Sequence, residues 1–578
     1  MKPICIVFFT AIMLIQQLKA QTPYAVLNPG QTDYNSKFGV YPDHEGNFYL
    51  VNKSYYPQDL DAGAGVLTYG PPNQQVLIAK YTSSFELLWS AHIEQATILE
   101  SKAAFVADDN SLLIAGTTST DFTIYTATGT STVSTPSGQP MWLAKFDSDG
   151  GLLNAIAIGG PSGSNAPYPV STSVDNSGNA TITGYYTGNV DFDPGVGATT
   201  LSGSLSDAYG FIAKYSATGN LLWAKKIGNG SNTCSVLDHA VDNAGNIILG
   251  GWFTQTVDFD LDPFVTHALT AVGSGDAFFA KYDADGNYIW AGQLIENLFY
   301  GGVNEIETDA GNNIYVSGFM DKPCDFDIGP AVKTRKPHGT GFYVAKYTSS
   351  GALKWIRQPS GNGDFLLNEM YVDPAGNVFT SGTFSGTFDF DFSTGTYNLS
   401  GPDVDLLITD QWLSCMDKSG NFNYAFSLHT DPTVISGISS IYSVCVTTDN
   451  KLIIAGKYLK TLDIDPGVPV WEISVPGVTE AGFVIGYDQP VFRVGDIEIS
   501  TTLQVYPNPA DREITFVLGD VASADISIID MQGKLIYHTS YNSDEEASID
   551  VSAIPEGIYI LRAKTNDQIK SSTICIAH

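Results

Sequence analysis

Short runs of alternating hydrophobic and polar residues recur along most of this 578-residue chain, separated by turns rich in glycine, asparagine and aspartate. Alternation with a period of two is typical of strands that bury one face. The stretches "VDNAGNIILGGWFTQTVDFD" from Val241 and "DAFFAKYDADGNYIWAGQL" from Asp276 contain four such runs. Turns of the "DADGN" type place glycine or asparagine where a tight hairpin requires a positive φ. The pattern predicts an all-β fold of antiparallel strands.

This unit of four runs occurs seven times, at intervals of about 65 to 76 residues. Its markers are an Asp-x-x-Gly-Asn turn before the first run, the D-x-D pair in the second, an "AKY" third run and, in four copies, a tryptophan in the fourth. Four antiparallel strands repeated radially are typical of β-propeller blades. A linear solenoid is the alternative, although solenoid repeats are usually shorter and contain fewer strands. We therefore predict a seven-bladed β-propeller over residues 21–490. The recurrent tryptophans, which we expect to pack between blades, are Trp89, Trp223, Trp290 and Trp355.

The two ends of the repeat array complement each other. The last copy stops after its third run, "GFVIGYD" at Gly482 to Asp488. The segment that begins at Tyr24 aligns without gaps with the fourth-run segment that begins at Trp223. Pairing of the N- and C-terminal strands would remove the exposed edges of an open array. We therefore predict a ring closed by this pairing, with Tyr24 to Leu27 as the missing fourth strand.

Charge and the N-terminal segment limit the possible functions. The formal net charge is −33, which argues against nucleic acid as a partner because phosphate binding needs clustered basic residues. Residues 1–20 resemble a signal peptide, since Lys2 precedes an apolar stretch that is too short for a membrane span. No later segment predicts a transmembrane span. The five cysteines that follow are odd in number and widely spaced, and indicate neither a disulfide framework nor a zinc site. We expect an exported monomer.

Pairs of aspartates around one apolar residue recur in most repeats. In a strand the two carboxylates of such a pair share one face, where backbone N–H groups or a hard cation such as Ca²⁺ can stabilise them. No complete D-x-D-x-D-G loop is present, so turn capping and calcium binding both stay open. Calcium is the one cofactor that the sequence suggests. The candidate ligands are Asp191, Asp193, Asp258, Asp260, Asp325, Asp327, Asp389, Asp391, Asp463 and Asp465. A looser pair is Asp59 and Asp61, and the second repeat keeps only Asp121.

The repeat pattern ends near residue 490, and residues 491–502 form a predicted linker. Residues 503–578 show alternating runs and hairpin signals that predict a small Ig-like β-sandwich. In order, "YPNP", "DMQGKLI" and "GIYIL" resemble the type A C-terminal sorting domain of the type IX secretion system. The final "STICIAH" lacks the basic ending common in that family. The motif residues are Tyr506, Pro507, Asn508, Pro509, Gly533, Gly557 and Tyr559.

The resemblance implies a secreted or outer-membrane cell-surface protein with the type IX secretion machinery as a partner. The repeats also resemble bacterial β-propeller (SBBP-like) repeats, which implies a fold more than an activity. We identify no catalytic residues, because no repeat breaks the pattern with unusual charged residues. We therefore expect a non-enzymatic propeller whose loops bind an extracellular glycan, protein or surface component. The alternative is a glycan-active hydrolase or lyase with its site in the propeller funnel. The loop residues Lys333, Arg335 and Lys336 are the best candidates for contact with a partner.

Overall fold

The structure is a computed structural model, and the chain divides into two compact units, Met1–Gln489 and Pro490–His578. The described elements are β-strands apart from one 3₁₀ helix, η1 (Ser101–Ala103), and the strands pair antiparallel. The fold class is all-β, as predicted. The predicted signal peptide and linker lie outside the described residues. Those residues are 23–32, 38–62, 68–69, 74–98, 100–136, 138–159, 167–228, 233–262, 264–294, 302–320, 322–336, 341–391, 395–402, 409–430, 439–466, 471–475, 477, 480–489, 505–517, 524–530, 535–541, 546–564 and 569–578.

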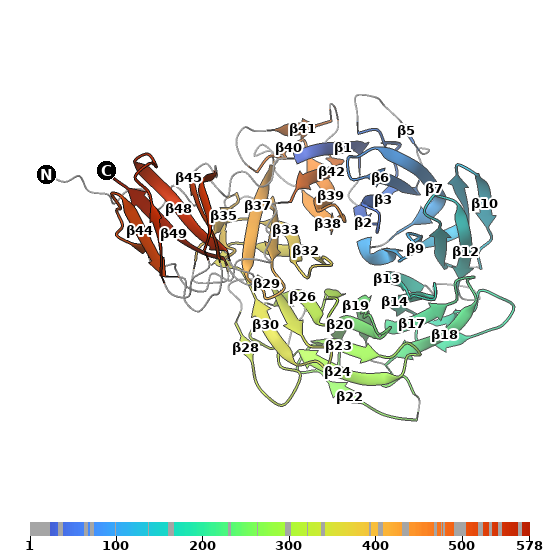
Figure 1. Ribbon diagram of the computed structural model, residues 1–578. Coiled ribbons are helices and arrows are strands. Elements are labelled where there is room, and N and C mark those ends of the chain that lie inside the picture. The colour runs from blue at the N-terminus through green and yellow to red at the C-terminus, as the bar shows by residue number, and fades with distance from the viewer. Residues whose placement is uncertain are drawn as a thin grey trace. The chain divides into compact units, whose positions relative to one another are not determined.

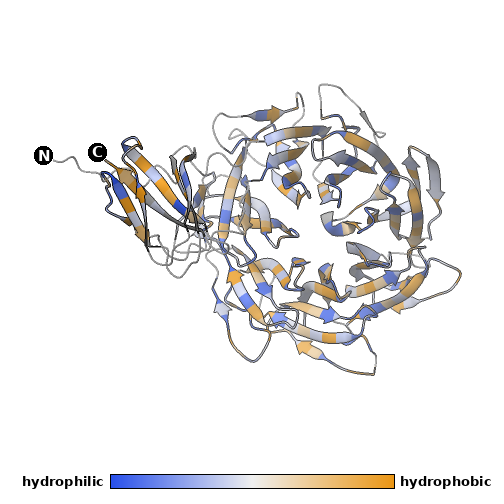
Figure 2. Ribbon diagram, in the orientation of Figure 1, coloured by the Kyte–Doolittle hydropathy of each residue, from blue (hydrophilic) through white to orange (hydrophobic). Residues whose placement is uncertain are grey.

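Each repeat of the N-terminal unit contributes four main strands, in which hydrophobic and hydrophilic residues are mixed (Figures 1 and 2). The first two repeats contain β2 (Phe38–Pro42), β3 (Asn47–Ser54), β6 (Gln75–Thr82), β7 (Leu87–Thr97), and β8 (Ala104–Val106), β9 (Leu112–Thr126), β11 (Met141–Phe146), β12 (Leu152–Ile158). The third and fourth contain β13 (Pro167–Val174), β14 (Ala180–Tyr186), β17 (Tyr209–Tyr215), β18 (Leu221–Ile227), and β19 (Cys234–Val241), β20 (Ile247–Phe253), β23 (Asp276–Tyr282), β24 (Tyr288–Leu294). The fifth and sixth contain β25 (Glu305–Thr308), β26 (Ile314–Met320), β29 (Gly341–Tyr347), β30 (Leu353–Arg357), and β32 (Phe365–Val372), β33 (Val378–Phe384), β36 (Asp410–Met416), β37 (Phe422–Thr430).

The seventh repeat draws its strands from both ends of the N-terminal unit. Its sheet has the order β1 (Pro23–Gln31), β42 (Glu480–Asp488), β39 (Lys451–Leu459) and β38 (Ser440–Val446). In the antiparallel ladder between β1 and β42, Val26 lies opposite Ile485 and Leu27 lies opposite Val484. Strand β1 therefore supplies the fourth strand that the last repeat lacks.

The first strands of the seven repeats contact one another in cyclic order. Strands β2, β8, β13, β19, β25, β32 and β38 each contact the next, and β38 contacts β2. Figure 1 shows them around a common centre, with the later strands of each repeat farther out. The apolar core of this unit consists of seven clusters, each formed by two neighbouring repeats, and one of them joins the seventh repeat to the first. Burial between repeats therefore holds the array together.

The predicted tryptophan positions lie between neighbouring repeats. The indole N–H of Trp89 in the first repeat donates to the carbonyl of Ser148 in the second, over 2.9 Å. A Cβ added at Gly150 of that hairpin turn would lie 2.6 Å from the same indole ring. Gly150 has φ of +84°, so glycine meets both the backbone and the packing requirement there.

Contrary to expectation, the second run of a repeat, which carries the D-x-D pair, is not one of the four main strands, because the strand before the Asp-x-x-Gly-Asn turn completes each sheet instead. The pairs lie in short ribbons of two strands that follow the second strand of their repeats. The first strand of each ribbon ends at the first aspartate of the pair. The ribbons are β4 (Gln58–Asp59) with β5 (Thr68–Tyr69), β15 (Asn189–Asp191) with β16 (Thr200–Ser202), β21 (Thr256–Asp258) with β22 (Ala268–Thr270), β27 (Cys324–Asp325) with β28 (Thr334–Arg335), β34 (Thr387–Asp389) with β35 (Asn398–Ser400), and β40 (Thr461–Asp463) with β41 (Glu472–Ser474). Strand β31 (Ser360–Asn362) also pairs with β34.

Two pairs of repeats are joined into larger sheets. In the second repeat "TDFTIY" replaces the aspartate pair, so β9 continues for 15 residues without a capped turn. Its second half pairs with β7 of the first repeat and with β10 (Gly129–Val133). In the same way, the end of β37 in the sixth repeat pairs with β40 of the seventh.

The C-terminal unit contains two sheets with a common core. One has the order β43 (Val505–Tyr506), β44 (Glu513–Val517), β47 (Glu546–Asp550), and the other has the order β46 (Leu535–Tyr541), β45 (Ala524–Asp530), β48 (Gly557–Lys564), β49 (Ile569–Ile576). Phe516 from the first sheet and Leu561 from the second belong to one buried cluster. Among the described residues no helix has the length and apolarity of a membrane span, and no cysteine forms a disulfide.

Candidate functional site

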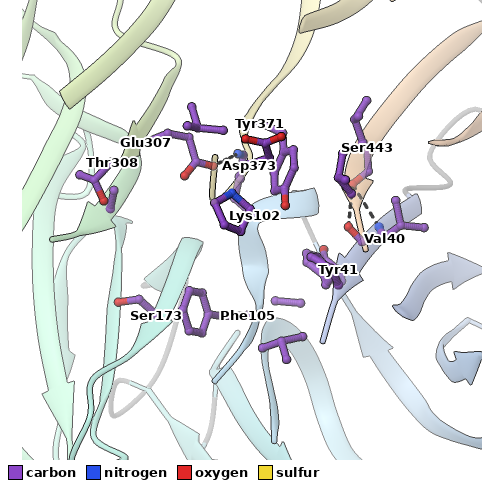
Figure 3. Close-up of a pocket in the computed structure, with 18 of the residues that line it drawn as sticks. Val40, Tyr41, Lys102, Phe105, Ser173, Glu307, Thr308, Tyr371, Asp373 and Ser443 are labelled. Atoms are coloured by element: carbon purple, nitrogen blue, oxygen red, sulfur yellow. Dashed lines mark hydrogen bonds and ion pairs between the residues drawn. The ribbon is translucent and has the colours of Figure 1, made fainter. Parts of the chain in front are cut away.

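A cavity of about 460 Å³ lies at the centre of the N-terminal unit, and we call it the central cavity. Residues from the first strands of all seven repeats line it. Figure 3 shows Lys102 reaching toward Glu307 within it, with Tyr41, Phe105 and Tyr371 on its wall. Cavities of this size are typical of small-molecule sites, so a position where seven strands converge is the first candidate for function.

Asp238, Glu307 and Glu369 line the cavity from three consecutive repeats, and Glu305 stands two residues before Glu307. Asp238, Glu305 and Glu369 each stand four residues before the turn aspartate of their own repeat. A β-bulge precedes this position in the fourth and sixth repeats, and also in the third and seventh, where a serine follows the bulge. A bulge re-aims the side chain that follows it, and bulges are frequent next to functional sites.

Lys102 of the second repeat is the counter-charge to these residues. Its Nζ atom lies 3.0 Å from Glu305 Oε2, 3.2 Å from Glu307 Oε1 and 3.4 Å from Glu369 Oε1. The ammonium also donates to the carbonyl of Met370 over 3.3 Å. With Asp238, these carboxyl groups form what we call the carboxyl cluster. It holds four acids against one base.

The four acids of the carboxyl cluster cannot all be ionised easily. Burial raises the pKa of Glu369 to about 7, although Lys102 acts in the opposite direction. Burial likewise raises the pKa of Glu307 and Asp238, and raises that of Glu305 well above its ordinary value. Burial alone would lower the pKa of Lys102, but the surrounding carboxylates raise it well above its ordinary value. The centre therefore keeps a fixed cation among acids whose burial opposes ionisation.

Two oxygens of this cluster, Glu305 Oε2 and Glu369 Oε2, have no hydrogen-bond partner among the described residues, and only the first lies against Lys102 Nζ, at 3.0 Å. The Glu369 side chain is only 6% exposed and lines the central cavity. Its Oε2 atom has no hydrogen-bond partner among the residues that the structure describes. By contrast, Asp238 Oδ2 accepts the N–H of Ile306 over 2.9 Å. An unpaired buried carboxylate oxygen is costly unless a ligand or a proton satisfies it.

A serine and a histidine on the cavity wall resemble a nucleophile and its base. Ser173 Oγ lies 2.8 Å from His239 Nε2, and Thr183 Oγ1 lies 2.8 Å from His239 Nδ1. Burial lowers the pKa of His239 to about 3, so this imidazole would be a poor proton acceptor at neutral pH. The ring is also oriented by the Thr183 hydroxyl, whereas the base of a nucleophile is usually oriented by a carboxylate. The trio is better explained as a buried link between β13, β14 and β19.

The aspartates predicted from sequence lie in the ribbons, and none of them lines the central cavity. Asp325 Oδ1 accepts the N–H of Asp327 over 3.1 Å and that of Lys333 over 2.8 Å. The equivalent first aspartates, which accept the same two bonds, are Asp191, Asp258, Asp389 and Asp463. The second aspartates, which donate one of those bonds, are Asp193, Asp260, Asp327, Asp391 and Asp465. These are the contacts of turn capping.

The residue between the two aspartates anchors the turn to its repeat. Phe326 is fully buried, and its carbonyl accepts a hydrogen bond of 2.8 Å from the hydroxyl of Tyr347 in the third strand. Within the described ranges, no group of three or more His, Cys, Asp or Glu residues is placed to hold a metal ion. Calcium binding at the aspartate pairs stays a prediction.

Capping gives the aspartate pairs a measurable role in stability. We expect Asp325→Ala to lower the free energy of unfolding by about 1–2 kcal/mol, because two backbone N–H groups lose their acceptor. Asp325→Asn, which keeps a side-chain carbonyl oxygen, is the matched control and should lose less. Thermal melts with calcium and with chelator should coincide if capping is the whole role. A midpoint that calcium raises, and that falls in Asp325→Asn, would establish the metal site instead.

Most of the sorting-motif residues are described. Tyr506 ends β43 and is exposed, as are Pro507, Asn508 and Pro509. The side-chain oxygen of Asn508 accepts the N–H of Cys575 over 2.8 Å, which ties the motif to β49. Gly557 begins β48, and the Tyr559 hydroxyl donates to the carbonyl of Pro555 over 2.8 Å. Gly533 lies outside the described residues. In the basic loop, Lys333, Arg335 and Lys336 are exposed.

Comparison with known proteins assigns the C-terminal unit. Residues 504–577 match the family described as "Secretion system C-terminal sorting domain". Over 204 residues the chain is 27% identical to an uncharacterized WD repeat-containing protein of Acanthamoeba polyphaga mimivirus. That match covers 31% of this chain and 14% of the viral protein.

Three solved structures show low similarity to the chain. A protein of unknown function from Bacteroides caccae has 10% identity and a TM-score of 0.25, over 58% of this chain and 94% of that one. An ulvan lyase bound to -[GlcA(1-4)Rha3S]- has 11% identity and a TM-score of 0.26, over 70% and 91%. A family 32 glycoside hydrolase from Bifidobacterium adolescentis has 8% identity and a TM-score of 0.21, over 95% and 78%. At these scores the similarity supports no argument about activity.

The expectation that no repeat breaks the pattern with unusual charged residues is wrong. The first strands do so at the position four residues before the turn, where Asp238, Glu305 and Glu369 replace the glycine, alanine or serine of the other repeats. An alignment of the seven segments before the turns contains this signal. The aspartate pairs form the stronger pattern because they recur, whereas a site needs residues that differ between repeats.

Proposed function

We propose that the protein is an exported seven-bladed β-propeller that binds a small extracellular ligand in the central cavity. The sorting domain indicates export through type IX secretion to the cell surface or the medium. The cyclic contacts of the seven first strands and the β1–β42 ladder support the closed ring. We assign the propeller to residues 21–490, with SBBP-like repeats, and the sorting domain to residues 503–578.

The observation that carries the binding role is the carboxyl cluster in the cavity wall. Burying four acids and one base costs free energy, and apolar residues of similar volume would give a more stable core. The first, third and seventh repeats contribute no residue to the carboxyl cluster, so the repeat fold does not require it. The cavity is therefore a better candidate than the loops, where the sequence had placed binding.

Blocking the cavity should abolish binding without unfolding the protein. Thr308 lines the cavity, and we expect Thr308→Trp to fill part of it. A thermal-shift screen of the mature protein against oligosaccharides and small metabolites should give at least one ligand that wild type binds and this variant does not. Thr334→Trp, in an exposed ribbon strand, is the matched control and should keep binding. Ligands that bind both variants equally would overturn a central site.

The alternative is a glycan-active hydrolase or lyase that uses the same cavity. The observation that favours it is Glu369, whose pKa of about 7 suits a general acid or base near neutral pH. Incubating the propeller with any glycan found in the screen separates the two functions. Intact glycan after prolonged incubation supports binding alone, whereas cleavage that Glu369→Gln abolishes would establish the enzyme.

A further inference from the structure

We propose that the central cavity recognises a small organic ammonium ion, which the carboxyl cluster binds beside Lys102. This inference rests on the proposed function, since it names the ligand of the same cavity. It requires three things of the site: acceptor oxygens that Lys102 leaves unused, a lining that suits an organic body, and a poor fit for a metal ion.

The acceptor comes from Glu369. Lys102 reaches Oε1 of this carboxyl group at 3.4 Å, which is a long contact, and Oε2 has no hydrogen-bond partner among the described residues. The side chain is only 6% exposed, and it lines the cavity. One ammonium has three N–H donors, so it cannot satisfy the oxygens of four carboxylates. A second ammonium from a ligand would supply the missing donors through charge-assisted hydrogen bonds.

The rest of the lining suits an organic body. Val40, Phe105, Ile306 and Val444 line the same cavity, together with the ring of Tyr371 (Figure 3). Aromatic rings attract cations that lie over their faces, and apolar walls accept the carbon chain of an amine. A hydrated metal ion would gain nothing from such a wall. Within the described residues no three His, Cys, Asp or Glu side chains converge as metal ligands, which also favours an organic cation.

Proton exchange gives this site a signature. The groups that act on or face Glu369 are Lys102, Asp238, Glu305, Glu307, Tyr41 and Cys445. Because burial raises the pKa of Glu369 to about 7, this carboxyl group is mostly protonated at pH 6 and mostly ionised at pH 8. Only the ionised form accepts all the donors of an ammonium. Amine affinity should therefore rise about tenfold from pH 6 to pH 8, and binding below pH 7 should release protons.

Titration calorimetry of the mature protein with butylammonium tests the proposal. Wild type should bind butylammonium and not 1-butanol, and two buffers of different ionisation enthalpy at pH 6 should reveal the released proton. Glu369→Gln should weaken binding at least tenfold and remove the pH dependence. Glu480→Gln is the matched control, because Glu480 Oε1 pairs with Lys457 Nζ at 2.6 Å outside the cavity. This control should bind like wild type.

The outcomes separate the inference from the proposed function. Equal binding of butylammonium and butanol, or tighter binding of calcium that Glu369→Gln removes, would overturn the ammonium site. If the screen yields a ligand blocked by Thr308→Trp but no amine binds, the inference fails and the proposed function stands. If no ligand of any kind is blocked by that variant, both fail. Stronger binding of Nα-acetyl-lysine methylamide than of butylammonium would support the ammonium site and identify a protein side chain as its source.

Discussion

Replacing Lys102 by methionine should lower the free energy of unfolding by about 3–5 kcal/mol at pH 8. The side chain is 18% exposed, and its ammonium is the cation that contacts Glu305, Glu307 and Glu369. Methionine keeps the volume and apolar stem but leaves these carboxylates without their counter-charge. The loss should be measured by urea denaturation at a series of pH values.

The size of this loss should depend on pH. A carboxyl group whose pKa is raised in the folded state contributes stability below its unfolded pKa and loses it as pH rises through the folded pKa. For Glu369 that window runs from its ordinary 4.5 to about 7. Both proteins should lose stability across this window, and the methionine variant should lose more, because no ammonium favours ionisation. The difference should therefore be smaller at pH 5 than at pH 8.

A second lysine provides the control for that variant. Lys451 pairs with Asp488 in an exposed position, where ion pairs contribute little. Lys451→Met should cost less than about 1 kcal/mol at either pH. A loss in Lys102→Met that is equally small, or that does not change with pH, would show that Lys102 is not the counter-charge of the carboxyl cluster.

The repeat architecture could be predicted because its contacts are local. Asp242 Oδ1 accepts the N–H groups of Ala244 and Asn246, so one turn is specified by residues that stand close together in sequence. The same local pattern recurs in successive repeats, which makes it visible without any structure. The pairing of β1 with the last repeat could also be predicted, because the N-terminal segment has the pattern of the fourth run that the last repeat lacks.

The central cavity could not be predicted in the same way because its contacts are distant. Lys102 stands 205 residues before Glu307, and nothing near either residue indicates the other. The extension of β9 could not be predicted for the same reason. It depends on pairing with β7 of the neighbouring repeat as well as on the absence of the capped turn. A one-residue signal was present at the position of Asp238, but its meaning depends on knowing that the first strands surround a common centre.

Asp242→Ala should also lower the free energy of unfolding by about 3–5 kcal/mol. Asp242 Oδ2 lies 2.7 Å from Lys281 Nζ, and the two side chains are 1% and 5% exposed. Lys281 also donates to the carbonyl of Ser349 in the next repeat, over 3.3 Å. The alanine variant would leave a buried ammonium unpaired at the contact between two repeats and would remove the acceptor of two turn N–H groups. Chemical denaturation at pH 7 measures the loss.

The sixth repeat supplies the matched control, because Cys415 takes the place of the lysine there. Asp373→Ala should lower the free energy of unfolding by only about 1–2 kcal/mol, since it removes a turn acceptor but leaves no cation unpaired.

The pH dependence of stability should also differ between the two variants. Burial would raise the pKa of Asp242, but hydrogen bonds from Lys281 and Asn246 hold it below its ordinary value, so its contribution is present at neutral pH and disappears as pH falls through the folded pKa. Burial raises the pKa of Asp373, so its contribution disappears as pH rises. Equal losses in the two variants, with parallel pH profiles, would mean that the buried lysine does not need its partner. The Lys–Asp pair would then be a marker of the repeat and not a source of its stability.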